Sequence, residues 1–442
     1  MAVLILVGFA LWGILSYFQH NKGFFLLAVF LVISSCINLI PSSIISEDLS
    51  LAMALTAIIY DLAHGVKVFS TKRDPVGKLI LILLFYCFFE AIWTAAQGAE
   101  TFIYALKVYR RDLFYVYYFV FKQLSLSDIM RVCKPLLTLT IVGGVLYYLQ
   151  FASIHMLSNF SDNTVVAGGG YSRYSNTPML SIPFLVFFIV KRDNVNIWVL
   201  LFFVGLLIMP MSRGNIIASI IAIAYYIVKR GKFNSYRGIA IKLLIPFLLF
   251  SPVLIYRFIQ DNDRGTAAQD IRKALSFSDF SEFDYGSGGT FTFRIALALE
   301  RFNYMVNNPE TLLTGVGVIH EQSPNNKFEF YIGTNLIYMD GVERRQTIDT
   351  EDIAYVSHTF RYGLIYLLLF ILFIRSCFVR LKSGMKKHAI GAVGFVFLFI
   401  LVINSLSSDV FSFLRFMFIP LLNMAIIKTC DNENLTKLYP IK

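Results

Sequence analysis

Two arginines stand out because of the segments around them. Arg213 lies between the apolar segments 206–211 and 215–228, and Arg294 lies within 257–358, a long polar stretch. A guanidinium group can bind two phosphate oxygens at once, so two arginines suit a diphosphate better than two lysines would. We therefore expect chemistry on an anionic group that is carried by a lipid. For Arg213 the alternative is a side chain that reaches the lipid headgroups from a tight helical turn.

Arg294 lies in a segment that is expected to form an amphipathic helix. A glycine pair precedes this segment, and Pro309 follows it, so the helix should end near Val306. Arg301 on the same helix is expected to be a solvated charge that pairs with its acidic neighbours. Taken alone, Arg294 fits either a ligand-binding role or a surface role.

Three acidic residues, Asp349, Glu351 and Asp352, precede the next apolar helix. A carboxylate at that place could cap the helix N-terminus and interact favourably with the helix dipole. Asp352 could equally be a general base that accepts the proton of a sugar hydroxyl. His358 is another titratable candidate, although a polar group at a helix start needs no catalytic role.

Other polar residues point less sharply to chemistry. Arg173 follows the glycines 168–170 in a loop that is expected to be flexible, and it would be a third arginine on the same side as Arg213. His320 has no matching cluster of ligand residues, so we expect no metal site. None of the five cysteines falls within 257–358, so neither a disulfide framework nor a cysteine metal site is expected.

The composition is that of an integral membrane protein. Of the 442 residues, 57% are hydrophobic and only 15% are charged, whereas soluble domains average about a quarter charged residues. The net charge of +11 does not indicate nucleic-acid binding, because cytoplasmic loops of membrane proteins collect lysine and arginine for orientation alone. We therefore expect an all-α polytopic membrane protein.

Thirteen segments are apolar and approach the length of about 20 residues that crosses the hydrocarbon. Two of them, 49–64 and 104–121, carry charges and could be re-entrant or interfacial, so about twelve to fourteen transmembrane helices are expected. The segment 104–121 carries three basic residues, Lys107, Arg110 and Arg111. They would either add positive charge on the outer side of the membrane or anchor the segment to anionic lipid. The thirteen segments are 2–19, 24–41, 49–64, 79–97, 104–121, 135–156, 177–191, 195–211, 213–228, 239–256, 359–375, 390–405 and 410–428.

The charges of the connections predict the orientation. Lysine and arginine gather in the connections 67–78, 229–237 and 375–387, whereas 42–50 and 405–409 contain neither. By the positive-inside rule the basic connections are cytoplasmic. This orientation places the long polar stretch and Arg213 on the outer side.

The chain is thus expected to have four parts. An N-terminal bundle of about ten helices spans 1–256. A long extracytoplasmic loop that contains short helices spans 257–358. C-terminal transmembrane helices span 359–428, and a cytoplasmic tail spans 429–442.

Three stretches form an ordered set around the long loop. The first is Ser-Arg-Gly at 212–214, after a hydrophobic helix. The second is Arg294 with its Ala/Leu-rich helix, followed by Asn-Pro-x-x-Leu-Leu-x-Gly-x-Gly at 308–317. The third is Asp-Ile-Ala-Tyr-Val at 352–356 with Tyr-Gly-Leu-Ile at 362–365, which leads into a new apolar helix. Together they resemble the O-antigen polymerase and O-antigen ligase superfamily of bacterial polysaccharide enzymes.

The resemblance implies a GT-C-like glycosyltransferase of the bacterial cytoplasmic membrane. Such an enzyme works at the outer leaflet without a cofactor, a metal or a nucleotide sugar, and its donor is a glycan on undecaprenyl diphosphate. By the resemblance, Arg213 and Arg294 would hold the diphosphate leaving group, with Arg173 as a third contributor. A flippase and a chain-length regulator of the same pathway would be partners, and nucleic acid would not.

The branch of the superfamily is indicated by one departure. In the ligase branch a histidine opens the motif that precedes the last helices, and Asp352 stands at that position here. This departure favours the polymerase branch and leaves the identity of the base open. Asp352 would orient or deprotonate the acceptor, and Tyr355 and His358 would contact the substrate.

Two alternatives differ in what the protein would do. A ligase would join a finished glycan to another acceptor. A transporter of lipid-linked oligosaccharide generally has internal repeats and polar sites within the membrane. No segment of this chain repeats at a fixed period, and its polar residues concentrate in the long loop, so the polymerase remains the favoured prediction.

Overall fold

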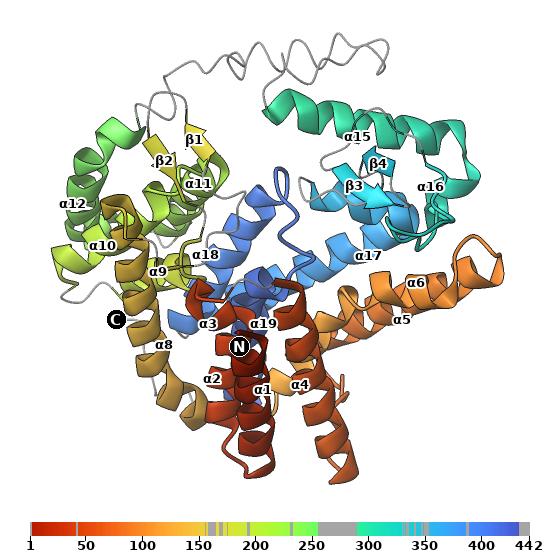
Figure 1. Ribbon diagram of the computed structural model, residues 1–442. Coiled ribbons are helices and arrows are strands. Elements are labelled where there is room, and N and C mark those ends of the chain that lie inside the picture. The colour runs from red at the N-terminus through yellow and green to blue at the C-terminus, as the bar shows by residue number, and fades with distance from the viewer. Residues whose placement is uncertain are drawn as a thin grey trace.

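The computed structural model is a helical protein with two short β-hairpins (Figure 1). It describes residues 2–40, 43–154, 156–157, 165–167, 171–174, 176–191, 195–229, 233–254, 290–328, 330, 332, 336–339, 342–345, 348, 353–385 and 389–432.

The described helices and strands follow one another along the chain in three groups. The first group is α1 (Ala2–Phe18), α2 (Lys22–Ile33), α3 (Ser35–Asn38), α4 (Ser43–Ala63), α5 (Pro75–Ala96), α6 (Phe102–Tyr109), η1 (Asp112–Val116), α7 (Tyr117–Phe121), α8 (Leu126–Leu149) and η2 (Gln150–Ala152). The second is β1 (Val165–Ala167), β2 (Tyr171–Arg173), α9 (Ser181–Lys191), α10 (Ile197–Ile208), α11 (Arg213–Lys229) and α12 (Phe233–Leu249). The third is α15 (Thr290–Asn307), α16 (Glu310–Thr314), β3 (Leu336–Met339), β4 (Val342–Arg345), α17 (Ala354–Met385), α18 (Ala389–Asn404) and α19 (Leu414–Asn432).

Three helical segments of the described chain are long and apolar enough to cross a membrane: Pro75–Ala96, Leu126–Ala152 and Ala354–Met385. Large apolar side chains such as Phe85 and Leu368 are exposed on them, as expected for surfaces that face lipid. Each of the thirteen predicted segments overlaps at least one helix. The segment 104–121 is not one helix, however, because α6, η1 and α7 divide it.

Helices from distant parts of the chain form the centre of the bundle. α17 packs against α5, α18 and α19, and α18 also contacts α9 and α11. In Figure 1, α15, α16 and the β3–β4 hairpin lie together beside α17. The amphipathic helix expected from the sequence is confirmed as α15, whereas the two antiparallel hairpins were not expected.

Several predicted helix boundaries differ from the structure; α8, for example, begins at Leu126 and not at 135. Two further differences concern the predicted division of the chain. α17 begins at Ala354, so Tyr355 and His358 belong to this helix and not to the loop expected over 257–358. α19 continues to Asn432, beyond the helix end expected at 428. In both places a polar stretch extends an apolar helix, since the backbone hydrogen bonds of a helix tolerate polar side chains at its ends.

One end of the bundle is held together by a buried carboxylate. Asp74 precedes α5 and accepts hydrogen bonds from Lys122 Nζ at 2.8 Å, Arg380 Nη2 at 3.1 Å and the Tyr118 hydroxyl at 2.8 Å. Burial alone would raise the pKa of Asp74, but the bonds from Lys122, Gly77 and Tyr118 hold that pKa below its ordinary value. Two basic residues from distant parts of the chain, Lys122 and Arg380, therefore meet at this end.

α17 is interrupted at Gly363, whose φ of 74° and ψ of −174° are not helical. A break in a helix leaves carbonyl oxygens of the preceding turn without helical donors. Here Val316 N donates to Phe360 O at 2.9 Å, and Gly317 N donates to Arg361 O at 3.1 Å. The Tyr86 hydroxyl donates to the next carbonyl, Tyr362 O, at 2.8 Å. The glycine motif at 308–317 thus caps the break with its own backbone.

This contact requires glycine on both sides. A Cβ on Gly315 would lie 2.1 Å from Arg361 O, and a Cβ on Gly363 would lie 2.1 Å from Leu313 O. Gly315 also has a φ of 79°, a conformation that other residues rarely adopt. The motif at 308–317, within the expected loop, and the motif at 362–365, after it, are therefore packed backbone against backbone.

We predict that Gly315→Ala destabilises the protein strongly. Gly98 is the matched control, because its φ is 71° but an added Cβ would meet nothing within 4 Å. Gly98→Ala should cost about 1–2 kcal/mol for the backbone conformation alone. Gly315→Ala should cost a further ~1–3 kcal/mol for crowding. Thermal unfolding of the purified variants in detergent measures both, and equal losses in the two variants would contradict the proposed contact.

Candidate functional site

Arg213 is the first residue of α11 and lies beside the connection between α18 and α19. The turn that precedes it is tight, with Met211 at a φ of 54°. A Cβ on Gly214 would lie 3.2 Å from both Asn404 Oδ1 and Ser407 Oγ, and Asn404 Nδ2 donates to Asn215 Oδ1 at 2.6 Å. The predicted tight turn before α11 is therefore confirmed, and the first turn of α11, which begins with the half-buried Arg213, lies next to residues 404–407.

The same connection contacts the first turns of α17. Ser405 Oγ donates to the Tyr355 hydroxyl at 3.1 Å. Further along, Ser412 Oγ lies 2.9 Å from His358 Nε2 and donates to Asp409 Oδ2 at 2.6 Å. Residues 405–413 thus join the start of α11, which carries Arg213, to the start of α17.

These contacts determine how His358 is protonated when it is neutral. The Ser412 hydroxyl has one hydrogen, which it donates to Asp409 Oδ2. Ser412 Oγ must then accept from His358 Nε2–H, which leaves the lone pair on Nδ1. With 12% of its side chain exposed, His358 is reachable from outside, and it stacks on Tyr366 with ring centroids 5.3 Å apart. In this arrangement, the His358 side chain can accept a proton at Nδ1.

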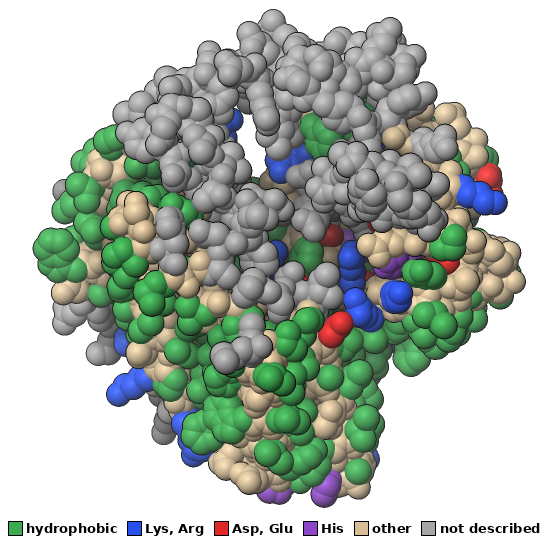
Figure 2. All heavy atoms as spheres, in the orientation of Figure 1, with side chains coloured by type: hydrophobic (Ala, Val, Ile, Leu, Met, Phe, Trp, Pro, Cys, Tyr) green, Lys and Arg blue, Asp and Glu red, His purple; other side chains and the backbone are tan. Residues whose placement is uncertain are grey.

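Further acidic side chains lie at this end of the bundle. Asp112, buried in η1, accepts a hydrogen bond from the Tyr362 hydroxyl at 2.7 Å. Asp48 at the start of α4 forms an ion pair with Arg110 at 3.0 Å. Burial raises the pKa of its neighbour Glu47, and nearby arginines partly oppose that rise. Figure 2 shows side chains of both charges gathered around a recess in the middle of one face.

Arg294 lies on α15, which packs against the same start of α17. Ala296 and Leu297 of α15 form one apolar cluster with Ile353 and Val356 at the beginning of α17. Arg294 is therefore on a helix that contacts the first turns of α17, and Arg213 is on a helix that reaches those turns through the connection 405–413. This placement brings Arg213, Arg294, Tyr355 and His358 to one end of the bundle.

Arg301 corrects one expectation. We expected a solvated charge, but only 1% of Arg301 is exposed. Its guanidinium pairs with Glu300, as predicted for an acidic neighbour, and lies 4.3 Å from the centre of the Phe330 ring. Glu300 also accepts a hydrogen bond from Ile332 N at 3.2 Å. Arg301 is buried because these partners satisfy its charge inside the loop structure.

Four other predicted site residues lie wholly or partly outside the described residues. Asp349, Glu351 and Asp352 lie outside the described residues. Arg173 ends strand β2, where its backbone is paired with Val165, so the loop expected to be flexible contains a hairpin. The side chain of Arg173 is not among those described.

His320 has partners that indicate a role in holding the loop. Its backbone N–H donates to Glu100 Oε2 at 3.1 Å, and its Nδ1 accepts from Gln322 N at 3.1 Å. Glu100 is buried and also accepts from the Ser323 hydroxyl at 2.7 Å. Across the described residues, no group of three or more His, Cys, Asp or Glu side chains could hold a metal ion.

Sequence reasoning missed Asp409, Ser412 and Asp112. Asp409 was noted only as part of a connection without lysine or arginine, and Ser412 lies at its end. A useful signal was available for Asp112, since a carboxylate inside an apolar stretch is costly and tends to be functional. No family model matches the chain, and no curated protein matches it.

We predict that the two arginines of α15 differ in their effect on stability. Arg301→Met leaves the Glu300 carboxylate buried without its partner, which should cost about 3–5 kcal/mol. Arg294→Met, at a half-buried position, should change the free energy of unfolding much less. Chemical unfolding of the two purified variants provides the measurement. A similar loss in both would show that Arg294 is as structural as Arg301.

Proposed function

We propose that the protein is a membrane glycosyltransferase that polymerises lipid-linked oligosaccharide repeat units. The observation that supports the proposal is that Tyr355 and His358 lie in the first turns of α17, which contact α15, the helix of Arg294, and the connection 405–413, which also lies beside the start of α11 after Arg213. Cations beside a side chain able to accept a proton suit transfer from a diphosphate to a hydroxyl. The resemblance of the three motifs to the O-antigen polymerase and ligase superfamily supports the same conclusion.

In the proposed reaction, the donor is a glycan joined through its anomeric carbon to undecaprenyl diphosphate. A hydroxyl at the non-reducing end of a second lipid-linked repeat unit attacks that carbon, and the bond to the diphosphate oxygen breaks. Arg213 and Arg294 stabilise the negative charge that develops on the departing diphosphate. Arg173 is a third candidate for this role. The energy of the reaction comes from the donor, so the proposal requires neither a metal nor a cofactor.

The proton of the attacking hydroxyl needs an acceptor. His358 can take it at Nδ1, and Asp409 acts through Ser412 as a positioning residue that keeps Nε2 protonated. Asp352 is the other candidate, and its position two residues before α17 places it close to His358 along the chain. Tyr355, beside Ser405, would contact the sugar.

The proposal includes a location and partners. The protein would lie in the bacterial cytoplasmic membrane as a GT-C-like enzyme with about twelve to fourteen spanning helices. The candidate site and the long loop would face outward, and the basic end around Asp74 would face the cytoplasm. A flippase would supply the substrate, and a chain-length regulator would limit the product.

We predict that Arg213→Ala and Arg294→Ala each block polymerisation. Loss of one electrostatic donor to a developing anion typically lowers kcat about 10²–10³-fold. In the native cell, each variant should leave surface glycan as single repeat units, whereas Arg131→Ala, an exposed arginine near the start of α8, should leave a full ladder. Full-length ladders from both variants, at wild-type protein levels, would contradict the proposed roles.

A second prediction concerns the proton acceptor. His358→Gln should lower kcat by about 10²–10⁴-fold. Asp409→Asn should lower kcat less while KM stays the same, because it only disturbs the orientation of His358. Elongation of purified lipid-linked repeat units in proteoliposomes measures both. Wild-type turnover by His358→Gln together with inactivity of Asp352→Asn would assign the proton to Asp352 instead.

The deletion phenotype separates the polymerase from its alternatives. Loss of a polymerase leaves capped single units, whereas loss of a ligase leaves long chains on undecaprenyl diphosphate. A transporter in proteoliposomes would only relocate its substrate and would form no elongated product.

A further inference from the structure

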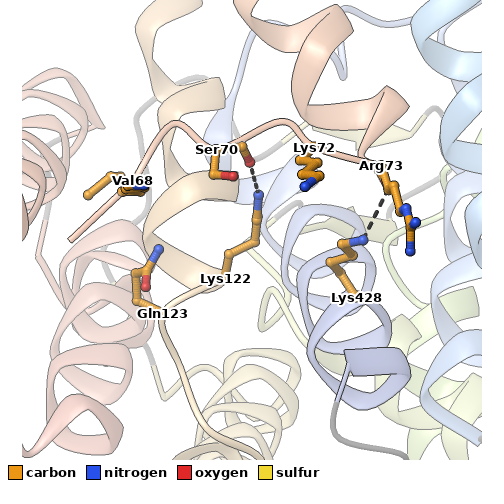
Figure 3. Close-up of a pocket in the computed structure, with 8 residues that line it drawn as sticks. Val68, Ser70, Lys72, Arg73, Lys122, Gln123 and Lys428 are labelled. Carbon is orange, nitrogen blue, oxygen red and sulfur yellow. Dashed lines mark hydrogen bonds between the residues drawn. The ribbon is translucent and has the colours of Figure 1, made fainter.

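At the Asp74 end of the bundle, a pocket of about 390 Å³ is lined by basic side chains. The cations are Lys67, Lys72, Arg73, Lys122 and Lys428, and the polar residues Ser70 and Gln123 complete the lining with Val68. They come from the connection 64–74, from the end of α7 and from α19 (Figure 3). None of the described side chains that line the pocket is acidic.

The pocket is built by specific bonds. Lys122 Nζ donates to Ser70 O at 2.8 Å, and Lys428 Nζ donates to Arg73 O at 3.0 Å (Figure 3). Arg73 has a φ of 54°, an uncommon conformation for a residue other than glycine. The connection is therefore fixed by its partners in a strained conformation, and its charges are held around one cavity.

Three of the five cations are available for an anion. Lys122 is paired with Asp74, whose second oxygen pairs with Arg380. Among the described residues, Lys67, Lys72 and the Arg73 guanidinium form no ion pair. Orientation in the membrane requires basic residues in a connection, but it does not require them to surround a cavity of this size.

The position of the pocket indicates a lipid. The apolar span Pro75–Ala96 begins directly after Asp74, and α7 ends at Phe121, directly before Lys122. Phe69, beside the pocket, is 38% exposed, as suits contact with acyl chains. Cations at this depth lie at the level of lipid phosphates.

We propose that this pocket binds the phosphate headgroup of an anionic phospholipid. The site lies at the opposite end of α17 from His358 and does not depend on the proposed glycosyltransferase activity. Its ligand is a component of the surrounding leaflet, so it is a binding site additional to the one for lipid-linked glycan.

The test uses the purified full-length protein with phosphatidylglycerol, phosphatidylcholine or inorganic phosphate, read by native mass spectrometry and by thermal unfolding. The double variant Lys72→Gln/Arg73→Gln removes two charges from the pocket and keeps the Arg73 carbonyl. The matched control Lys78→Gln/Lys382→Gln removes two exposed charges, one in the first turn of α5 and one near the end of α17. Lys67→Gln is a third variant that leaves the strained residue unchanged.

We expect phosphatidylglycerol to remain bound and to raise the unfolding temperature of the wild type and of the control, whereas phosphatidylcholine does neither. The affinity for phosphatidylglycerol should fall on the order of tenfold or more in the double variant, and less in Lys67→Gln. Equal binding of both lipids would overturn the proposal. So would unchanged affinity in both pocket variants, or stabilisation by inorganic phosphate without any effect of phosphatidylglycerol.

Discussion

The hydrogen bonds at the break in α17 are the constraint on which the rest of the structure depends. Within an apolar environment an unsatisfied carbonyl costs several kcal/mol, so a helix can be interrupted only where other donors replace its own. Val316 N, Gly317 N and the Tyr86 hydroxyl provide these donors. The polar segment after α15 is thereby joined to the helical bundle by its own backbone.

The break also explains why the candidate site forms where it does. Before Gly363, the first turns of α17 contact α15 and the connection 405–413. After Gly363, the helix packs as an apolar segment against α5 and α18. α17 therefore has two parts, a first part whose polar residues contact other polar segments and a second part that is an apolar span. Gly363 separates the two parts.

The two ends of the bundle differ in how charge is compensated. At the Asp74 end, one buried carboxylate satisfies two cations and further cations surround a pocket. At the other end, the carboxylates of Asp48, Asp112 and Asp409 are held by an arginine, a tyrosine and a serine. The first arrangement suits the capture of an anion, and the second suits the ordering of groups that move a proton.

Sequence patterns predicted the helices well, because apolar length and the glycines and prolines at helix ends are local properties. The turn before Arg213, the amphipathic helix of Arg294 and the glycine motif all lie where the residues indicated. The contact between Gly315 and Gly363 was not predictable, since the two glycines meet only in the folded chain. The same holds for Ser412 and Asp409, whose short polar connection has no distinctive composition, and for the burial of Arg301 against Phe330.

The attachments of α17 to α5 have a mechanical consequence. Tyr86 bonds to Tyr362 O near one end of their contact, and Asp74 bonds to Arg380 near the other. A piston-like slide of α17 by one helical turn, about 5.4 Å, would break both bonds at once. The two bonds therefore oppose sliding of α17 along α5, so that the pair of helices forms a fixed axis beside which α15 and the connection 405–413 are placed.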